Sequence, residues 1–407
     1  MLRPESQLTL IPFLNPHLSL KLVDFLLSHT TLPQNELQLV KLRLLESTCL
    51  SEQYQQVLSQ AKPSESVPEL FSNKCKDAAA KVEDFSKNLS PSLEALKEAL
   101  SLPADFNYQQ YLEYGTLLFE FGRYTECVAV LQIIRKGTPS PTILLQTLWG
   151  LFAATILLEN WTDCPDIIAK LQEVIDSQSQ TLSYDSLLFQ RTWLVHHILF
   201  CSFSSSDLIH LTAETFIGDK YATVLQHTAP GLLRYFVASA LCSRHRHKSH
   251  TLLRDCISIV EKTAPTSEDP LLAFLLHCTS PICEEKSVTD LKALTDTINN
   301  DFFLEKIRER LLDAAYLLLI ENILRTHNGH TIKTLSAVLK LDDQQTEAYI
   351  TTLSKTKINH LEVKLDVKTG EIVATKQHHS QARHMTDRLK SQSEKFQSLK
   401  QSLRNKH

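Results

Sequence analysis

Histidines are the residues whose type and spacing come closest to a metal site in this chain. There are 17 of them, and the densest group is His245-x-His247-x-x-His250. Two arginines and a lysine stand beside and between these three histidines. Because cationic side chains repel a metal ion at such short range, we expect no metal ligands here.

Other residues with catalytic potential are better explained by structure. His196-His197 lies in an apolar stretch, where a histidine commonly satisfies its ring N–H with a backbone carbonyl. Asp163 and Asp166 stand at a predicted helix start and are not expected to act as an acid/base pair. Glu284-Glu285 is expected in a loop.

Sequence motifs of catalysis are missing as well. The sequence contains no G-x-x-x-x-G-K-[ST], G-x-G-x-x-G, H-E-x-x-H or G-x-S-x-G. The nine cysteines are scattered without a C-x-x-C pair, which favours buried thiols over a disulfide framework or a zinc site. We therefore predict no catalytic residue, no cofactor and no metal, and a protein that is not an enzyme.

The composition indicates the elements that carry these residues. Apolar residues make up 43% and charged residues 22%, as in a folded globular protein, and only eight of the 407 residues are glycine. Scarce glycine favours helices over glycine-rich turns and phosphate-binding loops. The chain is long enough for two or three domains or for one elongated helical array.

The apolar part of the uncharged stretch at residues 137–158 is too short to be a membrane span. This stretch has no charged residue, but Pro139 and Pro141 break its first part and leave about 16 apolar-rich residues. A span needs roughly 20, so we predict a buried helix. The N-terminus also lacks the basic-then-apolar order of a signal peptide.

Helical periodicity covers most of the chain. An amphipathic pattern runs from Leu8 to Tyr54, followed by a connector at 61–71 and a charged helical stretch at 74–100 that we expect Pro91 to interrupt. Further helices are predicted at 185–203, 206–216, 219–243, 249–262, 271–278, 287–298 and 301–327.

A repeat is visible between residues 106 and 190. Tyr111-x-x-Tyr114-Gly115 precedes Phe121-Gly122-Arg123-Tyr124, and Trp149-Gly150 recurs 35 residues after Gly115. Glycine lets two helices approach closely, and the period is near that of tetratricopeptide-type helical hairpins. We predict right-handed helical repeats of the TPR or HEAT type.

The segment 327–376 has the order of a winged-helix module. Two helices are predicted, one from Thr331 to Leu339 and one opened by Asp342 or Asp343. Apolar residues then alternate over Leu361–Val367, and after a turn at Gly370 a second strand follows at Ile372–Ala374.

Charge argues against duplex binding by this module. It has seven lysines, no arginine and six acidic residues, whereas a DNA-binding wing needs a basic face. We therefore predict that the wing binds protein by adding a strand to a neighbouring sheet. The candidate residues are Leu361, Val363, Leu365, Val367 and Ile372.

The tail at 377–407 carries an apolar heptad seam, interrupted at Gln392. The seam consists of Ala382, Met385, Leu389, Phe396, Leu399 and Leu403, and the last five are candidate partner-binding residues in a shared helix bundle. A tail folded back on its own domain is the alternative. Residues 376–407 carry a net charge of +6, whereas the whole chain has a net charge of −4. Such a basic segment either contacts RNA or forms a solvent-exposed face.

Several ordered segments resemble a known family. Helical repeats followed by a winged helix and a terminal helix are similar to the PCI-domain scaffold subunits of the proteasome lid, the COP9 signalosome and eukaryotic translation initiation factor 3. The match is narrower with the E-type subunits of that initiation factor. It rests on the segments Leu8–Leu18, Leu22–Leu26, Leu148-Trp149-Gly150, Glu159-Asn160-Trp161, Gln190–His196, Leu233-Arg234-Tyr235 and Asn300–Leu304.

The resemblance implies an organisation and a role. It implies an N-terminal helical region at 1–105, repeats at 106–190, a PCI domain at 191–376 that includes the winged helix, and a C-terminal helix. It implies a non-catalytic scaffold supporting assembly of the 43S pre-initiation complex and mRNA recruitment. The implied partners are the PCI and MPN subunits of initiation factor 3, the 40S ribosomal subunit and, indirectly, the cap-complex scaffold factor and mRNA.

The implied location is the cytoplasm, with a nuclear pool in some members and no membrane partner. Two alternatives remain at this point. The chain could be a PCI subunit of the signalosome or of the proteasome lid, or it could be a nucleic-acid-binding winged-helix protein.

Overall fold

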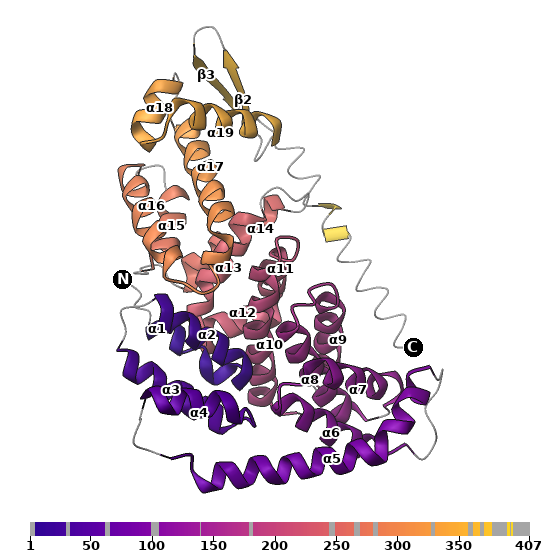
Figure 1. The fold of residues 1–407 in the computed structure, drawn as a ribbon. Helices are drawn as coiled ribbons and strands as arrows, with labels where there is room; N and C mark the ends of the chain where they lie inside the picture. The colour runs from indigo at the N-terminus through magenta and orange to yellow at the C-terminus, as the bar shows by residue number, and fades with distance from the viewer. Residues whose placement is uncertain are drawn as a thin grey trace.

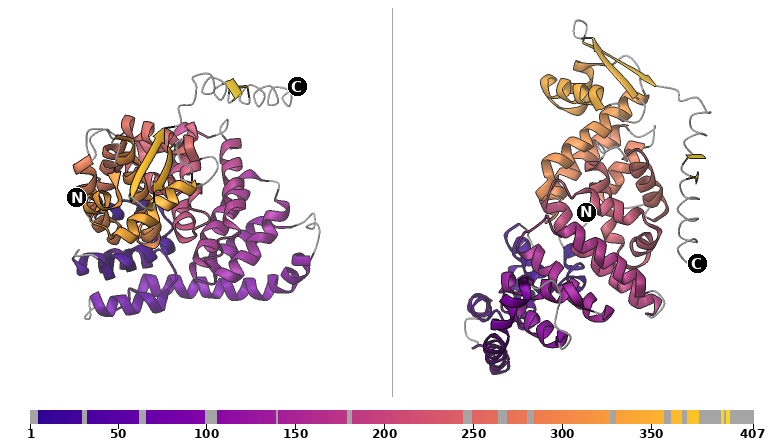
Figure 2. Two further views of the ribbon diagram at one scale, coloured as in Figure 1. Left: turned by 90° about the horizontal axis from the view of Figure 1, so that it is seen from above. Right: turned by 90° about the vertical axis from the view of Figure 1, so that its right-hand side faces the viewer.

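A computed structural model of the chain shows a mainly helical protein (Figure 1). The structure describes residues 5–29, 33–61, 66–98, 106–138, 140–178, 182–243, 249–263, 269–279, 284–326, 330–356, 361–366, 370–376, 389–390 and 392–393. Within these ranges the strands form one small sheet near the C-terminal end. In Figures 1 and 2 the long helix α5 (Glu69–Glu98) and this sheet lie at opposite ends of the molecule.

The N-terminal half is a series of consecutive helices. They are α1 (Glu5–Leu8), the 3-10 turn η1 (Ile11–Phe13), α2 (Pro16–His29), α3 (Gln34–Glu46), α4 (Ser51–Ala61), α5, α6 (Tyr108–Glu120), α7 (Tyr124–Gly137), α8 (Pro141–Leu157) and α9 (Cys164–Ser177). One large apolar core runs from this half into the C-terminal sheet, and a smaller one joins α2, α3, α4 and the start of α5.

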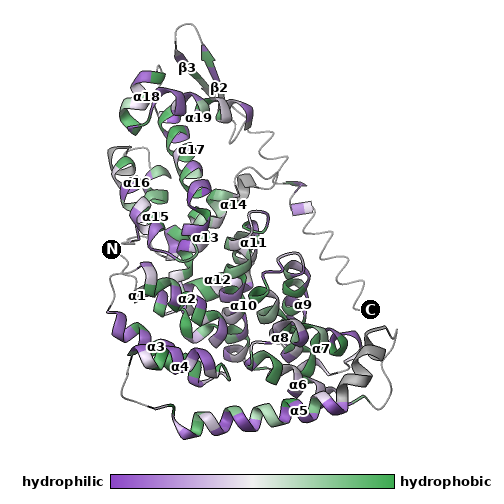
Figure 3. Cartoon of the chain, in the orientation of Figure 1, coloured by the Kyte–Doolittle hydropathy of each residue, from purple (hydrophilic) through white to green (hydrophobic). Residues whose placement is uncertain are grey.

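Helix α5 corrects one expectation, because it continues through Pro91. A proline removes one backbone donor from a helix, and the neighbouring turns keep their own hydrogen bonds. Figure 3 shows hydrophilic and hydrophobic residues interspersed along the coloured part of α5. Phe71 lies in the small core and Val82 in the large one, so α5 links the two.

The glycines of the predicted repeat lie where helices cross closely. Leu131 of α7 inserts between α6 and α8, and a Cβ added at Gly115 or Gly150 would lie 3.0 Å from a Leu131 methyl group. The close approach of α6, α7 and α8 therefore depends on both glycines. This confirms the interpretation of the 35-residue spacing as a packing feature.

Gly122, in the turn between α6 and α7, gives a testable prediction. Its φ is +77°, and an added Cβ would lie 3.3 Å from Leu50 Cδ2. Because side chains disfavour this backbone region, Gly122→Ala should lower the free energy of unfolding by about 1–2 kcal/mol in urea denaturation. Gly231→Ala is the matched control, since no atom lies within 4 Å of its Cβ position. Equal losses in both variants would contradict the prediction.

The C-terminal half continues the helical array. It comprises α10 (Tyr184–Ser204), α11 (His210–Ile217), α12 (Asp219–Thr223), the π-helical turn η3 (Val224–Thr228), η4 (Pro230–Leu232), α13 (Leu233–Cys242), α14 (Ser249–Thr263), α15 (Pro270–Thr279), α16 (Glu284–Asn299), η5 (Glu305–Ile307) and α17 (Arg308–Thr326). Consecutive members pack on one another, and α13 and α17 contact several helices each.

Three predicted helices are shorter than expected, and one of them, predicted at 206–216, begins only at His210. The helix predicted at 219–243 is broken by Pro230, which pushes Ala229 out of the helical region to φ −141° and ψ 66°. The helix predicted at 301–327 begins later, because the Asp301 carboxylate accepts hydrogen bonds from the N–H groups of Phe303 and Leu304. Residues 302–304 therefore form a capped turn before η5 and α17.

The C-terminal module consists of β1 (His330–Thr331), α18 (Ile332–Leu339), α19 (Asp343–Thr356), β2 (Leu361–Asp366) and β3 (Glu371–Lys376). The order of two helices and a hairpin is as predicted. Thr331 begins α18 through a reciprocal capping box with Thr334. The predicted positive φ of the turn glycine is confirmed at Gly370, where φ is +69°. Strand β1 was not predicted, since two residues carry no periodicity.

Most of the apolar stretch at 137–158 lies in α8, whose central residues are buried in the large core. No helix in the described ranges combines the length and apolar character needed to cross a bilayer.

Candidate interaction surfaces

The predicted wing strands form the outer part of a three-stranded antiparallel sheet. The strand order is β1-β3-β2, so β3 lies in the middle and β2 lies at an edge. Leu365 is opposite Ile372 and Val363 is opposite Ala374. In the part of the sheet that the structure describes, β2 pairs with β3 alone and forms one edge of the sheet.

Side chains of the predicted wing set face the protein's own core. Val363 and Ile372 are each 2% exposed, and Leu365 packs against the same core. Val367 and the side chain of Leu361 lie outside the described residues. A partner would therefore meet the backbone of β2 and not these apolar side chains. Partner binding at this strand stays a prediction.

The opposite face of the sheet carries charge and one exposed apolar residue. Lys364 is paired across the sheet with Val373, which is 52% exposed. Asp366 lies opposite Glu371 at the hairpin end, where two like charges weaken a strand pair. The described residues of this face do not form a basic surface, and the absence of duplex binding stays a prediction.

The module is joined firmly to the array by α17. Tyr349 of α19 donates a hydrogen bond of 2.7 Å to Asp313 Oδ1 of α17, and its ring stacks on Tyr316. Burial and this carboxylate both raise the pKa of Tyr349. The contact keeps the position of the wing coupled to the array.

For the tail, the structure describes little of the predicted seam. Leu389 lies in a helical segment and is 66% exposed. Met385, Phe396, Leu399 and Leu403 lie outside the described residues, so the role of the seam stays a prediction.

The two buried histidines are structural, as predicted. His196 Nδ1 lies 2.6 Å from the Thr192 carbonyl oxygen and His197 Nδ1 lies 2.8 Å from that of Trp193, each donating within α10. Burial lowers the pKa of both rings to about 4. His17 of α2 is also buried, with its Nδ1 2.9 Å from Tyr124 Oη, and burial lowers its pKa to about 4.

These three histidines predict acid sensitivity. Their folded pKa lies below the ordinary value, so between pH 6.5 and 4 the unfolded chain binds protons that the folded chain does not. The free energy of unfolding should be complete above pH 6.5 and fall by the order of several kcal/mol toward pH 4. Urea unfolding at pH 7, 6 and 5 measures this.

The control for the acid experiment is His196→Asn with His197→Asn, whose amides do not titrate. The loss of stability between pH 7 and pH 5 should be smaller in this double variant than in the unmodified chain. An identical loss in both proteins would show that other groups cause the acid sensitivity.

Other candidate chemical residues have ordinary structural positions. Asp163 and Asp166 stand at the start of α9, as predicted, whereas Glu284 opens α16 instead of lying in a loop. The segment 244–248 with two of the three clustered histidines lies outside the described residues. Elsewhere in the described chain, no three His, Cys, Asp or Glu residues converge as metal ligands do.

The cysteines that the structure describes are free thiols, and all but the partly exposed Cys75 are buried, as predicted. Burial raises the pKa of Cys127 to about 12, so this thiol stays protonated and unreactive.

The ordered sequence segments meet in space at two places. At the first, Trp149 Nε1 of α8 donates to Gln190 Oε1 of α10 at 3.0 Å, and the Trp149 and Trp193 rings meet edge to face. Phe13, just before α2, stacks on His196 with ring centroids 4.7 Å apart. Segments from residues 13, 149 and 190–196 therefore form one aromatic junction.

The second meeting place is a buried ionic cluster at Arg234 of α13. Its guanidinium donates to Asp269 at 2.7 Å and to Asp301 at 3.0 Å, and Tyr235 Oη also donates to Asp301. All three charged side chains are at most 7% exposed. Although burial opposes its charge, the two carboxylates raise the pKa of Arg234 overall. The cluster holds together α13, the start of α15 and the turn before α17.

The N-terminal segment closes onto this region. Gln7 Nε2 donates to the Asn300 carbonyl oxygen at 2.9 Å, and Phe25 of α2 packs edge to face on Phe302. Sequence reasoning missed Gln7 and Asp269. Asp269 precedes Pro270, and an Asp-Pro helix start was the one signal available for it.

A family model described as the eIF3 subunit 6 N terminal domain matches residues 7–109. The chain is 25% identical to the E subunit of eukaryotic translation initiation factor 3 from Bombyx mori, over 97% of this chain and 94% of the relative. The protein of the same name in Aedes aegypti is 25% identical, with 95% and 92% covered. The one in Neosartorya fischeri is 24% identical, with 89% and 84% covered.

The chain is similar to E subunits of initiation factor 3 along nearly its whole length, and its N-terminal part matches the N-terminal domain model of that subunit. Relatives from insects and fungi align along nearly the whole chain, and so the segments that meet in the core lie within the shared region. The names of these relatives describe a subunit of a translation initiation factor.

Proposed function

We propose that this protein is a scaffold subunit of the initiation factor 3 complex, supporting assembly of the 43S pre-initiation complex and mRNA recruitment to the 40S subunit. The relatives aligned along the chain, all named as the E subunit of this factor, carry the proposal. Its partners are then the PCI and MPN subunits, the 40S subunit and, indirectly, the cap-complex scaffold factor and mRNA. Its place is the cytoplasm, with a nuclear pool.

The proposal assigns four regions to the chain. They are an N-terminal helical region at 1–105, TPR-like repeats at 106–190, a PCI domain at 191–376 whose winged helix occupies 327–376, and a C-terminal heptad helix at 377–407. The close packing of α6, α7 and α8 around Leu131 supports the repeats. The order α18, α19, β2, β3 supports the winged helix.

The wing joins a neighbouring subunit through the edge of β2. A partner strand added there would satisfy the backbone groups that no other described strand pairs. The near-neutral charge of the module favours a protein over a nucleic acid at this edge.

A pair of proline variants tests the wing. On an edge strand, consecutive residues direct their N–H groups alternately into the sheet and outward. Of Lys364→Pro and Leu365→Pro, the variant that removes an inward donor loses a ladder hydrogen bond and should lower the melting temperature more, whereas the other removes an outward donor and should stay better folded. We expect the well-folded variant to lose at least about tenfold in affinity for the complex, as one lost anchoring contact would cause. Full assembly by that variant would mean that β2 is not an interface.

The experiment that tests the function is purification of the tagged protein from its own cells at moderate salt, with mass spectrometry of its companions. We expect other initiation factor 3 subunits together with small-subunit ribosomal proteins. Signalosome or proteasome-lid subunits would overturn the proposed function and leave the fold unaffected. Nucleic acid without protein partners would also overturn it and would direct attention to the basic tail.

A further inference from the structure

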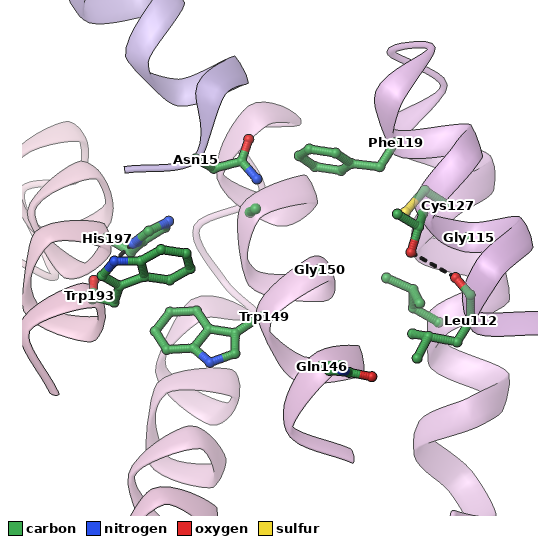
Figure 4. A pocket seen from close by; sticks show the side chains of 13 residues that line it. Asn15, Leu112, Gly115, Phe119, Cys127, Gln146, Trp149, Gly150, Trp193 and His197 are labelled. Atoms are coloured by element: carbon green, nitrogen blue, oxygen red, sulfur yellow. Dashed lines mark hydrogen bonds between the residues drawn. The ribbon is translucent and has the colours of Figure 1, made fainter. Parts of the chain in front are cut away.

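A pocket opens at the aromatic junction between α6, α8 and α10, and no wing residue lines it. Its volume is about 160 Å³. Figure 4 shows Trp149, Trp193 and His197 on one side, Leu112, Phe119 and Cys127 on the other, and Asn15 between them. Thr116 and Gln146 are exposed at the mouth, whereas His197 and Cys127 are buried at depth.

The size of the pocket limits what can occupy it. Pockets for cofactors and drug-sized molecules have volumes of roughly 300–1,000 Å³. A cavity of about 150 Å³ with apolar walls holds a single benzene ring. At about 160 Å³, this pocket fits one aromatic side chain and is too small for a nucleotide or a typical cofactor.

The lining limits the chemistry of the occupant. None of the pocket's lining residues is an Asp, Glu, Lys or Arg, so no side chain there can pair with a phosphate or a carboxylate. Two tryptophans supply flat apolar walls, and outside them Phe189 of α10 extends the aromatic surface with 47% of its area exposed. Uncharged walls of this kind suit an aromatic side chain, the type most enriched at the centres of protein interfaces.

Asn15 places one polar group at the pocket. Its Oδ1 accepts a hydrogen bond from the His17 N–H at 3.0 Å, which caps the start of α2. Figure 4 shows its amide nitrogen pointing toward the pocket, and this nitrogen has no hydrogen-bond partner among the described residues. An N–H group at an aromatic wall can face the π surface of an inserted ring.

We propose that this pocket receives an aromatic side chain from an uncharged segment of a partner protein. That the partner is another subunit of the same complex rests on the proposed function, whereas the affinity of the pocket for an aromatic ring does not. The wing and the tail are then not the only contacts of this chain, because the repeat region contributes a site of its own.

The test measures binding of 5-fluoroindole to the full-length chain by fluorine NMR. A good fit for a ligand of this size predicts a dissociation constant on the order of 1 mM. Asn15→Asp keeps the acceptor that caps α2 and places a negative charge beside the pocket, so we expect at least about tenfold weaker binding. Asn15→Ser keeps a cap without the charge and should bind within about threefold of the unmodified chain. Thermal melts establish that both variants are folded.

Two further measurements identify the occupant. If a partner side chain fills the pocket in the assembled complex, 5-fluoroindole should bind the free chain and fail to bind the complex purified from cells. Absence of binding to the free chain, equal binding by Asn15→Asp, or equal binding by the free chain and the complex would each overturn the proposal. Displacement of 5-fluoroindole by adenosine monophosphate would also overturn it, in favour of an RNA base.

Discussion

Replacing Arg234 with methionine should lower the free energy of unfolding by about 3–5 kcal/mol, because breaking a buried ion pair leaves charges without compensation. The guanidinium joins Asp269 and Asp301, which are 3% and 1% exposed. Both carboxylates would remain in the core with their backbone hydrogen bonds and without a cation. Urea unfolding followed by circular dichroism measures the loss.

Arg191→Met is the matched control for this prediction. Arg191 pairs with Asp176, but that carboxylate is 31% exposed and keeps a second partner in Lys220. The control should therefore lose much less, on the order of 1 kcal/mol. Adding Asp269→Asn and Asp301→Asn to Arg234→Met should restore part of the stability, since it removes the unpaired charges. A loss at Arg234 no larger than the loss at Arg191 would contradict the assigned role of the cluster.

Leu389→Asp combined with Phe396→Asp should detach the protein from its complex without unfolding the array. Leu389 is 66% exposed in the described part of the tail, and both residues belong to the predicted heptad seam. A carboxylate on a helix–helix seam must be desolvated on assembly, which costs several kcal/mol per charge, so recovery of partners should fall at least about a hundredfold.

The control for the seam keeps the charge and the spacing and changes the face. Ser391→Asp with Ser398→Asp has the same seven-residue separation and lies off the seam. This control should co-purify with its partners as the unmodified protein does. Retention of partners by the Leu389 and Phe396 double variant, or equal loss in both double variants, would mean that the seam is not an interface.

Local pattern was enough to predict much of the secondary structure. The two helices and the hairpin near the C-terminus, the turn at Gly370 and the core histidines of α10 all follow from neighbours a few residues apart. The close packing at Gly115 and Gly150 follows from a repeat spacing of 35 residues. Proline effects were harder to predict, because their result depends on context. Pro91 lies within a continuous helix, whereas Pro230 ends one.

For the candidate surfaces too, the sequence predicts the local element, and the tertiary structure decides which of its sides is exposed. Alternation along Leu361–Val367 correctly predicts a strand, but period two cannot tell which face meets the protein's own helices. Packing against the large core buries Val363 and Ile372, and this leaves the backbone edge of β2 as the accessible feature. We therefore propose that the wing binds a partner through backbone pairing, whereas its apolar side chains stabilise the fold.

By itself, the sequence determined the helical class, the module order at the C-terminal end and the resemblance to the family, because each depends on local spacing or on segments in a fixed order. Only the tertiary structure decided how those segments work together. Gln7 reaches Asn300, Arg234 joins Asp269 and Asp301, and the aromatic pocket forms between helices far apart in the sequence. Such contacts arise when burial of the apolar faces stacks the helices, and spacing along one chain carries no record of which distant side chains that stacking brings together.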